Sequence, residues 1–465
     1  MKKMVKKEKD SPKIKERKYR ARVHCIKEGI FSSAKSSFGE RFVSPFAITI
    51  NASNSLVALL SAISGLLGPI SQMWSSRLIE KYSRKKIILK AVFFESLMWL
   101  PLIAIAILFY KGILVNTLPF LLLLSFSIYV IIMNITSPIW FSWAGDIVDD
   151  KYRGRWFSKR NLITGFVSVV LAISASFFLD YFKKNNWVML GFIILFSLAL
   201  LSRLASWKTF KKQYEPKIKL KKGYYFSFWD FLAKAPKNNF GKFTIFRTLL
   251  HISNCISAPL LAVYLLRYLK FSYSVYMIIT IAVVVFSTVI MEIWGKFADK
   301  YGNYRTLQIT AILIPTIPLL WILSPSPIYL ILVPPFVSGI TWAGFNLAAG
   351  NFIYDNVSQS KRGLAVSYYN ILGGIGIFIG ASIGALLIKI LKTSFIEPLF
   401  LIFIISAIAR IIVVSFGIKG IKEVKKTKKF RGPRDLENLI FKETKPTLAE
   451  EFHEIAHIKK YLTFK

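Results

Sequence analysis

The residues best able to do chemistry are charged and polar side chains inside runs of apolar residues. Six of them lie in two of these runs, residues 28–50 and 243–268: Lys35, Glu40, Arg41, Arg247, His251 and Asn254. A charge at the centre of a bilayer costs at least ~2.5–3.5 kcal/mol, so each should face a cavity or a partner. A carboxylic acid placed there can take up and release a proton, and Glu40 is the first candidate for this role.

Two other interpretations of these charges stay open. Glu40 can form a static pair with Lys35 or Arg41 that only neutralises charge, and Arg41 or Arg247 can bind an anionic substrate. Arg247 and His251 are four residues apart and share a helix face. Other polar residues within apolar runs are candidates for contact with substrate: Glu95, Glu292, Asn346, Asn351, Tyr368 and Tyr369.

A third pattern, His453-Glu454-Ile455-Ala456-His457, has the spacing that zinc peptidases use on a helix. A catalytic zinc site needs a third protein ligand, and residues 458–465 contain no histidine or acid. The sequence therefore predicts an amphipathic surface helix here. His453 and His457 are weak metal ligands only, and no cofactor is expected.

The elements that must position these residues are the apolar runs themselves. Hydrophobic residues make up 54% of the 465, and the apolar runs are each about 20 residues long, which is enough to span a bilayer. The runs are 28–50, 55–80, 86–110, 116–146, 161–182, 187–207, 243–268, 274–298, 305–324, 328–355, 363–391 and 396–418. The pattern predicts an all-α integral membrane protein with twelve transmembrane helices. It excludes a water-soluble enzyme, a coiled coil and a disordered chain.

The charge of the chain, with 63 Lys and Arg against 24 Asp and Glu, is concentrated in the tails and in alternate loops. The positive-inside rule places these segments and both termini in the cytoplasm, which explains the net charge of +39 without a nucleic-acid partner. Five segments follow: a basic tail 1–27, a six-helix bundle 28–207, a basic linker 208–242, a second six-helix bundle 243–418, and a tail 419–465.

The two halves of the chain repeat each other. Four correspondences occur in order along the chain: Pro45 with Pro259, the turn 76–84 with 295–303, Asp146 and Arg153 with Asp355 and Arg362, and Arg203 with Arg410. Their offsets of 214, 219, 209 and 207 drift only as loops change length. The sequence therefore predicts two pseudo-symmetric six-helix bundles, an arrangement typical of secondary transporters.

The turn after the second run of each half resembles the signature loop of the major facilitator superfamily, Gly-x-x-x-Asp-Arg/Lys-x-Gly-Arg-Lys. The second half matches at Gly295, Asp299, Lys300 and Gly302, whereas the first half has Ser76, Glu80 and Ser83 instead. The resemblance implies a gating role for Glu80, Arg84, Asp146, Arg153, Gly295, Asp299, Lys300, Asp355 and Arg362. A solvated turn, or simple bracing of the hairpin that Asp146 and Arg153 flank, remains the alternative.

The resemblance implies a monomeric secondary transporter of the cell membrane that moves a small solute by alternating access. Nothing in the sequence resembles an ATP-binding loop, so an ion gradient or the gradient of the solute must drive transport. Proton coupling through Glu40 is the expectation, and a facilitated-diffusion uniporter is the alternative. Outside transport, the alternatives are a membrane-anchored zinc hydrolase that uses His453, Glu454 and His457, and a transporter-like sensor.

Overall fold

The computed structural model describes residues 11–148, 153–216, 227–358, 361–391 and 397–424, together with 427, 428, 430, 432 and 435. Every regular element in these ranges is helical. Among the described residues, eleven helical spans are long and apolar enough to cross a membrane, some of them made of two consecutive helices. The first predicted span, 28–50, falls short of that standard because it carries four charged residues between Glu28 and Arg41 and is interrupted at Gly39. The predicted all-α membrane fold is confirmed.

The chain divides into two compact units. The first contains residues 1–222, 258–277 and 377–392, and the second contains 223–257, 278–376 and 393–465. The domain boundaries given above from charge and hydropathy remain a prediction.

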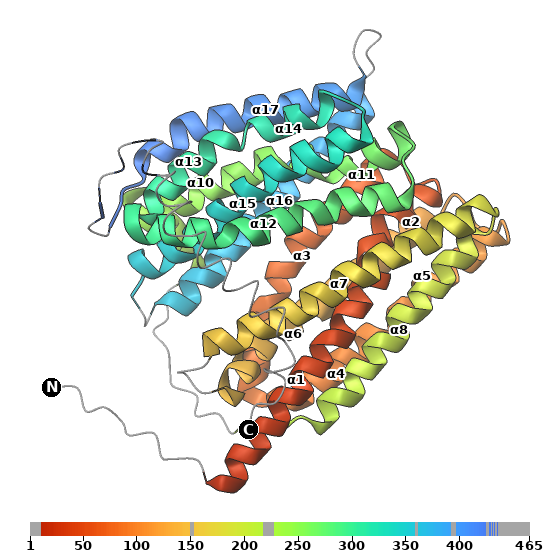
Figure 1. Ribbon diagram of the computed structural model, residues 1–465, viewed down its shortest axis with the longest axis horizontal. Helices are drawn as coiled ribbons and strands as arrows, with labels where there is room; N and C mark the ends of the chain where they lie inside the picture. Colours follow the sequence, from red (N-terminus) through yellow and green to blue (C-terminus); the bar gives the residue numbers. More distant parts are fainter. Residues whose placement is uncertain are drawn as a thin grey trace. The chain divides into compact units, whose positions relative to one another are not determined.

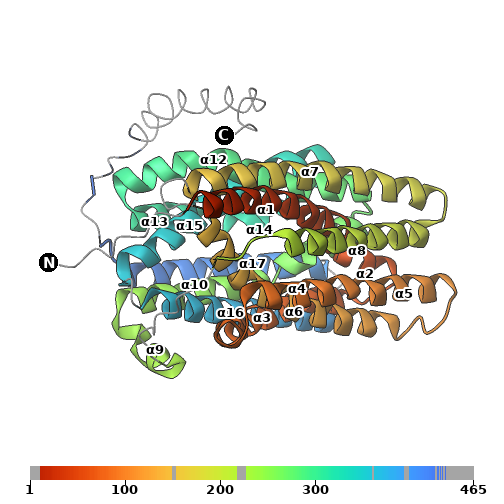
Figure 2. The same ribbon diagram turned by 90° about the horizontal axis from the view of Figure 1, so that it is seen from below.

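The helices of residues 12–212 belong to the first unit. They are α1 (Pro12–Phe38), η1 (Glu40–Phe42), α2 (Val43–Thr49), α3 (Asn54–Lys81), α4 (Arg84–Leu97), α5 (Trp99–Tyr110), α6 (Leu118–Ile147), α7 (Arg153–Lys184) and α8 (Val188–Lys212). Within this unit α1 packs against α7 and α8 (Figure 1). In the same unit α6 packs against α3 and α4 (Figure 2). Because α4 also packs against α8, the charged helix α1 and the helices around it form one bundle.

The remaining α-helices begin within the linker 208–242, at Phe228. They are α9 (Phe228–Lys234), α10 (Asn239–Cys255), α11 (Leu261–Val263), α12 (Tyr273–Tyr301), α13 (Asn303–Leu313), α14 (Thr316–Ile322), α15 (Pro327–Asn356), α16 (Arg362–Ile390) and α17 (Pro398–Gly417). In the second unit α13 packs against α15, and both α10 and α14 pack against α17 (Figure 1). A core of aromatic and aliphatic side chains from α10, α13, α15 and α16 holds these helices together.

Prolines interrupt corresponding spans of the two halves. The third span divides into α4 and α5 just before Pro101, and the ninth divides into α13 and α14 around Pro315 and Pro318. Proline lacks an N–H and clashes with the carbonyl four residues earlier, so each break frees backbone carbonyls inside the bundle. Those carbonyls need donors from elsewhere, and buried side chains can supply them.

The outer faces of the helices expose large apolar side chains. Phe120, Phe166 and Phe416 are 66%, 70% and 77% exposed, and each lies within a long helix. Such exposure is expected where the helices face lipid tails, because apolar side chains in contact with lipid are not exposed to water and carry no hydrophobic cost.

Candidate functional site

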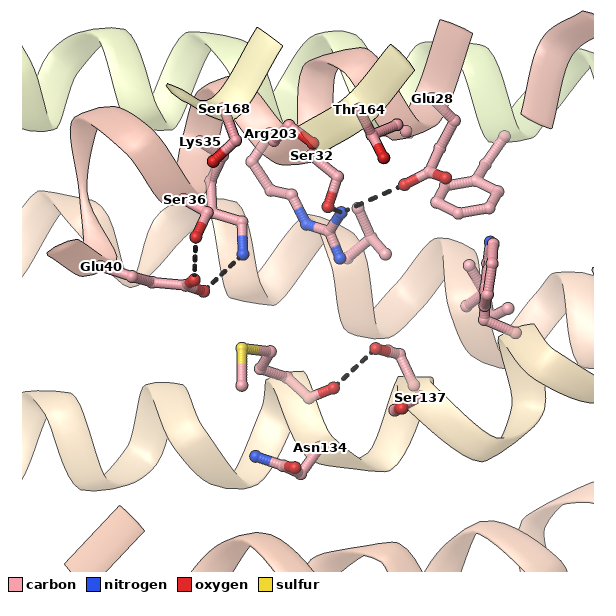
Figure 3. A pocket seen from close by; sticks show the side chains of 18 of the residues that line it. Glu28, Ser32, Lys35, Ser36, Glu40, Asn134, Ser137, Thr164, Ser168 and Arg203 are labelled. Atoms are coloured by element: carbon pink, nitrogen blue, oxygen red, sulfur yellow. Dashed lines mark hydrogen bonds and ion pairs between the residues drawn. The ribbon is translucent and has the colours of Figure 1, made fainter. Parts of the chain in front are cut away.

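A cavity of about 410 Å³ lies within the first unit (Figure 3). Glu28, Ser32, Lys35 and Ser36 of α1 line it, and Glu40 of η1 continues the same wall. Spacings of three, four and seven residues place these α1 side chains on one helix face. The opposite walls come from α4, α6, α7 and α8, which contribute Ile88, Val92, Met133, Asn134, Thr136, Ser137, Trp140, Arg160, Thr164, Ser168, Arg203 and Phe210.

The position of Glu40 follows from the end of α1. The helix stops at Gly39, where a Cβ atom would lie 2.1 Å from the ring of Trp99. A glycine is therefore required for Trp99 to pack against the turn. Trp99 in turn contacts the ring of Tyr129, with 5.1 Å between the ring centroids, and so helps to fix Tyr129 beside Glu40.

The carboxylate of Glu40 is held by three side chains. The Lys35 ammonium lies 2.6 Å from Oε1, and Ser36 donates to Oε2 at 2.6 Å (Figure 3). The Tyr129 hydroxyl also donates to Oε1. The ammonium of Lys35 also donates to Tyr129 Oη at 3.0 Å. The static pair of Glu40 and Lys35 that the sequence left open is present. It is also one end of a longer chain of contacts.

That chain continues from Lys35 through two buried carboxylates. Lys35 lies 3.3 Å from Oε1 of Glu95, whose Oε2 lies 2.6 Å from Nη2 of Arg203. Arg203 is 3.6 Å from Glu28, and Glu28 is 3.4 Å from Arg160. Each consecutive pair is opposite in charge, so the low dielectric of the interior strengthens every contact along the chain.

The six charges of this network balance. Glu28, Glu40 and Glu95 are matched by Lys35, Arg160 and Arg203, and Ser206 gives Glu28 a further hydrogen bond at 3.3 Å. Removing a single ion from water costs several kcal/mol, and a paired and hydrogen-bonded set avoids most of that cost. The cavity is therefore polar but close to electrically neutral.

Sequence reasoning did not assemble this network. Glu95 stood only as one polar candidate among several, Arg203 only as a repeated position, and Glu28, Tyr129 and Arg160 were not candidates. The available signal was a lone acid or base within several spans, such as Glu95 in one and Arg203 in another, because each such charge must find a partner. Which spans are neighbours cannot be read from one sequence.

The other predicted substrate residues lie in different surroundings. Arg247 lies against Tyr369, with Cζ 4.0 Å from the ring centroid, and Tyr369 packs on Phe243. Tyr368 instead contacts Phe228 and Phe231 of α9.

Four further predicted residues make few polar contacts. The side chain of Asn254 donates weakly to Cys255 Sγ at 4.0 Å. Asn346 is exposed, and Asn351 donates to Asn303 at 3.2 Å. Among the described residues, Nε of Arg41 is buried without a hydrogen-bond partner.

A second polar cluster of the first unit lies at the start of α4. The Arg84 side chain is fully buried and donates to Asp146 Oδ2 at 2.7 Å, and its backbone N–H donates to Glu215 Oε1 at 2.8 Å. Lys85 donates to the carbonyl of Gln213 at 2.9 Å. The predicted gating residues Arg84 and Asp146 thus contact each other, and Glu215 from the beginning of the linker joins them.

The second unit repeats this arrangement at the start of α13. Asn303 donates to Asp355 Oδ2 at 2.6 Å, and the backbone N–H of Tyr304 donates to Glu423 Oε2 at 2.8 Å. A carboxylate beside the first N–H groups of a helix is favoured by the helix dipole. Asn303 and Asp355 correspond to Arg84 and Asp146 in the repeat, and Glu423 corresponds to Glu215.

The other predicted gating residues do not join these two clusters through any contact found among the described residues. Arg362 donates to the carbonyl of Val357 at 3.2 Å, Asp299 is exposed, and Lys300 lies 5.4 Å from the ring of Tyr301. Gly295 is helical, with open space where a Cβ would lie. The side chains of Glu80 and Arg153 lie outside what the structure describes.

The predicted metal ligands His453 and His457 also lie outside the described residues. Within the described ranges, no group of three or more His, Cys, Asp or Glu residues could hold a metal ion. The described cysteines, Cys25 and Cys255, are both buried and free.

Sequence comparison assigns the family. The family model described as "Major Facilitator Superfamily" matches residues 30–251 and again 243–460, so the chain belongs to this superfamily and the resemblance is confirmed. It is a multi-pass membrane transporter of small molecules and not an enzyme. None of the curated proteins matches the chain.

Solved structures of transporters share the fold. A mutant of the nucleoside transporter NupG aligns with a TM-score of 0.66 at 14% identity, over 87% of this chain and 100% of that one. A bacterial homologue of the iron transporter ferroportin aligns at 0.64, with 14% identity over 86% and 98% of the two chains. A D-xylose-proton symporter aligns at 0.62, with 15% identity over 88% and 99%.

Proposed function

We propose that the chain is a proton-coupled secondary transporter that moves a small solute by alternating access, with Glu40 as the group that carries the proton. The supporting observation is the cavity wall at Glu40, where one carboxylate accepts hydrogen bonds from Lys35, Ser36 and Tyr129. A proton on Glu40 removes its attraction for Lys35. Lys35 then has only Glu95 as an acidic partner, so protonation changes the polar contacts along the whole wall.

The same proposal includes the placement of the protein. The termini and the basic linker 208–242 face the cytoplasm of a cell-membrane protein, because basic loops are retained on that side. The protein works as a monomer without a nucleic-acid partner. The gating role of the clusters around Arg84 and Asn303 belongs to this proposal too, since a carboxylate at a helix N-terminus can hold one state and release the other.

The test is proton flux in proteoliposomes that enclose a pH-sensitive dye. The solutes are D-xylose and uridine, together with three matched pairs: D-glucose and D-gluconate, benzamide and benzoate, glycerol and glycerol 3-phosphate. For each solute that the wild type co-transports with protons, Glu40→Gln should abolish uptake driven by a pH gradient, while exchange of labelled solute across the membrane continues. Ser33→Ala, which alters the same cavity wall without a charge, is the matched control.

Each result bears on one alternative. Driven uptake that survives in Glu40→Gln excludes the proton role and favours a uniporter. Solute binding without any flux favours a sensor. Loss of both uptake and exchange would instead assign Glu40 to solute binding.

A further inference from the structure

We propose that Arg247 binds the negatively charged group of the transported solute, a carboxylate or a phosphate ester. This inference rests on the transport function proposed above and adds the chemical class of the substrate. The cations inside the second unit differ in how far the protein compensates their charge.

The guanidinium of Arg247 has few partners of its own. Its Nη1 donates to the carbonyl oxygen of Tyr369 at 3.3 Å, and its Cζ lies 4.0 Å from the centroid of that ring. A guanidinium offers five N–H donors, and in the described residues no nitrogen of Arg247 is both buried and without a hydrogen-bond partner. The donors that Tyr369 does not use are therefore open to water and available to a ligand.

No carboxylate neutralises this charge in the described part of the second unit. One ion pair found there joins Lys296 and Glu292 at 3.0 Å, within α12, and does not involve Arg247. The contact with Tyr369 is of the cation–π type, which contributes between ~0.5 and ~2 kcal/mol. The Tyr369 carbonyl lies inside α16, where it also accepts the helical hydrogen bond. These two contacts orient the guanidinium but leave its charge largely uncompensated.

Arg410 shows how a buried cation is compensated without an acid. It is only 2% exposed and donates to the carbonyl of Ile314 at 3.2 Å and to the carbonyl of Asn254 at 3.4 Å. Pro318 frees the Ile314 carbonyl, and Asn254 stands at the end of α10. Carbonyls at helix C-termini carry partial negative charge, so Arg410 is held by two helix ends. Arg247 has no such helix end.

The backbone around Arg247 is built to admit the guanidinium. A Cβ at Gly373 would lie 2.4 Å from Nη1 of Arg247, and a Cβ at Gly376 would lie 2.6 Å from the carbonyl of Thr248. Any larger residue at these positions of α16 would displace the side chain or α10. His251 lies one turn along the same face of α10 and offers a second N–H donor.

By the repeat, Arg247 corresponds to a position that lines the cavity of the first unit. The offset of 214 that relates Pro45 to Pro259 relates residue 33 to residue 247, and Ser33 lines the cavity of the first unit. The first unit balances its charges at the cavity, whereas the second presents an unbalanced cation at the corresponding point. Arginine recognises carboxylates and phosphates with two parallel hydrogen bonds, which suits this exposed edge of the guanidinium.

The experiment is a thermal-shift measurement on the purified full-length protein in detergent. The probes are the three matched pairs defined above, at equal concentration and with ionic strength equalised by sodium chloride. The variants are Arg247→Gln, Arg247→Lys and Lys242→Gln; the last removes an exposed positive charge from the same helix. Dioleoylphosphatidylglycerol in mixed micelles tests a lipid headgroup as the source of the phosphate.

At least one anion should raise the melting temperature while its neutral partner does not. Arg247→Gln should weaken the binding of that anion about 10- to 100-fold, which is the loss of affinity expected when a hydrogen bond to a charged group is removed. Arg247→Lys should retain part of the affinity because it keeps the charge, and Lys242→Gln should bind as the wild type does.

Four results would overturn the assignment: equal stabilisation by neutral and anionic partners, an anion shift that survives in Arg247→Gln, no shift with any anion, or stabilisation by the lipid alone. None of them touches the proposed transport function. If a neutral solute binds and is transported with protons, the proton role proposed for Glu40 stands and only the proposal of an anionic substrate fails.

Discussion

At the level of single residues, Lys35 is the branch point of the cavity. Its ammonium is shared between Glu40 at 2.6 Å and Glu95 at 3.3 Å, while Arg203 holds the other oxygen of Glu95. A change in the protonation of Glu40 therefore reaches Glu95 through one side chain. This explains why a charge network, and not an isolated carboxylate, surrounds the proposed proton carrier.

The network makes a stability prediction for Arg203. Arg203→Met leaves Glu95 with Lys35 alone and should lower the free energy of unfolding by about 3–5 kcal/mol, as when one partner of a buried pair is removed. The double variant Glu95→Leu with Arg203→Met leaves Lys35 paired with Glu40 and Arg160 paired with Glu28. It should recover much of the loss. Melting temperatures in detergent would be measured for Arg203→Met, Glu95→Leu and the double variant. If the loss of stability in the double variant equalled the sum of the losses in the two single variants, the pairing of Glu95 with Arg203 would be contradicted.

The candidate site was predictable from the sequence only in part. Glu40 and Lys35 are five residues apart in one chain segment, so the sequence could offer their pairing as one of two alternatives, beside a pair with Arg41. The pairing of Glu95 with Arg203 joins residues 108 positions apart and depends on α4 packing against α8. Periodicity gives each helix its apolar faces but does not identify the neighbour on each face.

At the level of helices, the start of α13 shows why the signature glycine is present in the second half. Gly302 has a φ of +96°, and a Cβ there would lie 2.3 Å from Oε2 of Glu423. Glycine both permits this backbone conformation and leaves room for the carboxylate that caps α13. Ser83 at the corresponding point of the first half has a φ of −64°, so no glycine is needed there.

Replacing this glycine should be costly. Gly302→Ala should lower the free energy of unfolding by more than about 1 kcal/mol, because alanine is strained at positive φ and its methyl displaces Glu423. Gly165→Ala is the control: Gly165 is inside α7 with open space around its Cβ, so alanine should be neutral or slightly stabilising. Equal melting temperatures for the two variants would show that the position of the Glu423 carboxylate does not depend on a glycine at residue 302.

Helix boundaries were predicted well wherever hydropathy defines them. The predicted runs 116–146 and 328–355 correspond to α6 (Leu118–Ile147) and α15 (Pro327–Asn356). The first span differs, since α1 begins at Pro12, sixteen residues before the apolar run. Hydropathy marks where a helix meets lipid, whereas this helix continues through basic residues that contain no break before Gly39.

At the level of the whole molecule, the charge pattern predicts the orientation in the membrane. Alkaline phosphatase fused after Gly112, in the loop between α5 and α6, should be active if this loop faces the outside as the charge pattern predicts. The same enzyme fused after Pro216 should be inactive, since the positive-inside rule predicts that the basic linker stays in the cytoplasm. Green fluorescent protein at the two points should give the opposite result. The reverse pattern would exclude cytoplasmic termini.

The balance of charges around the cavity has an electrical consequence. A membrane potential does work of about 2.3 kcal/mol per elementary charge moved through 100 mV. Glu28, Glu40 and Glu95 together with Lys35, Arg160 and Arg203 sum to zero, so displacing this group as a unit requires almost no such work. With Glu40 protonated the same group carries one positive charge. The voltage across the membrane should then accelerate or retard only the proton-loaded step, and a current should accompany that step alone.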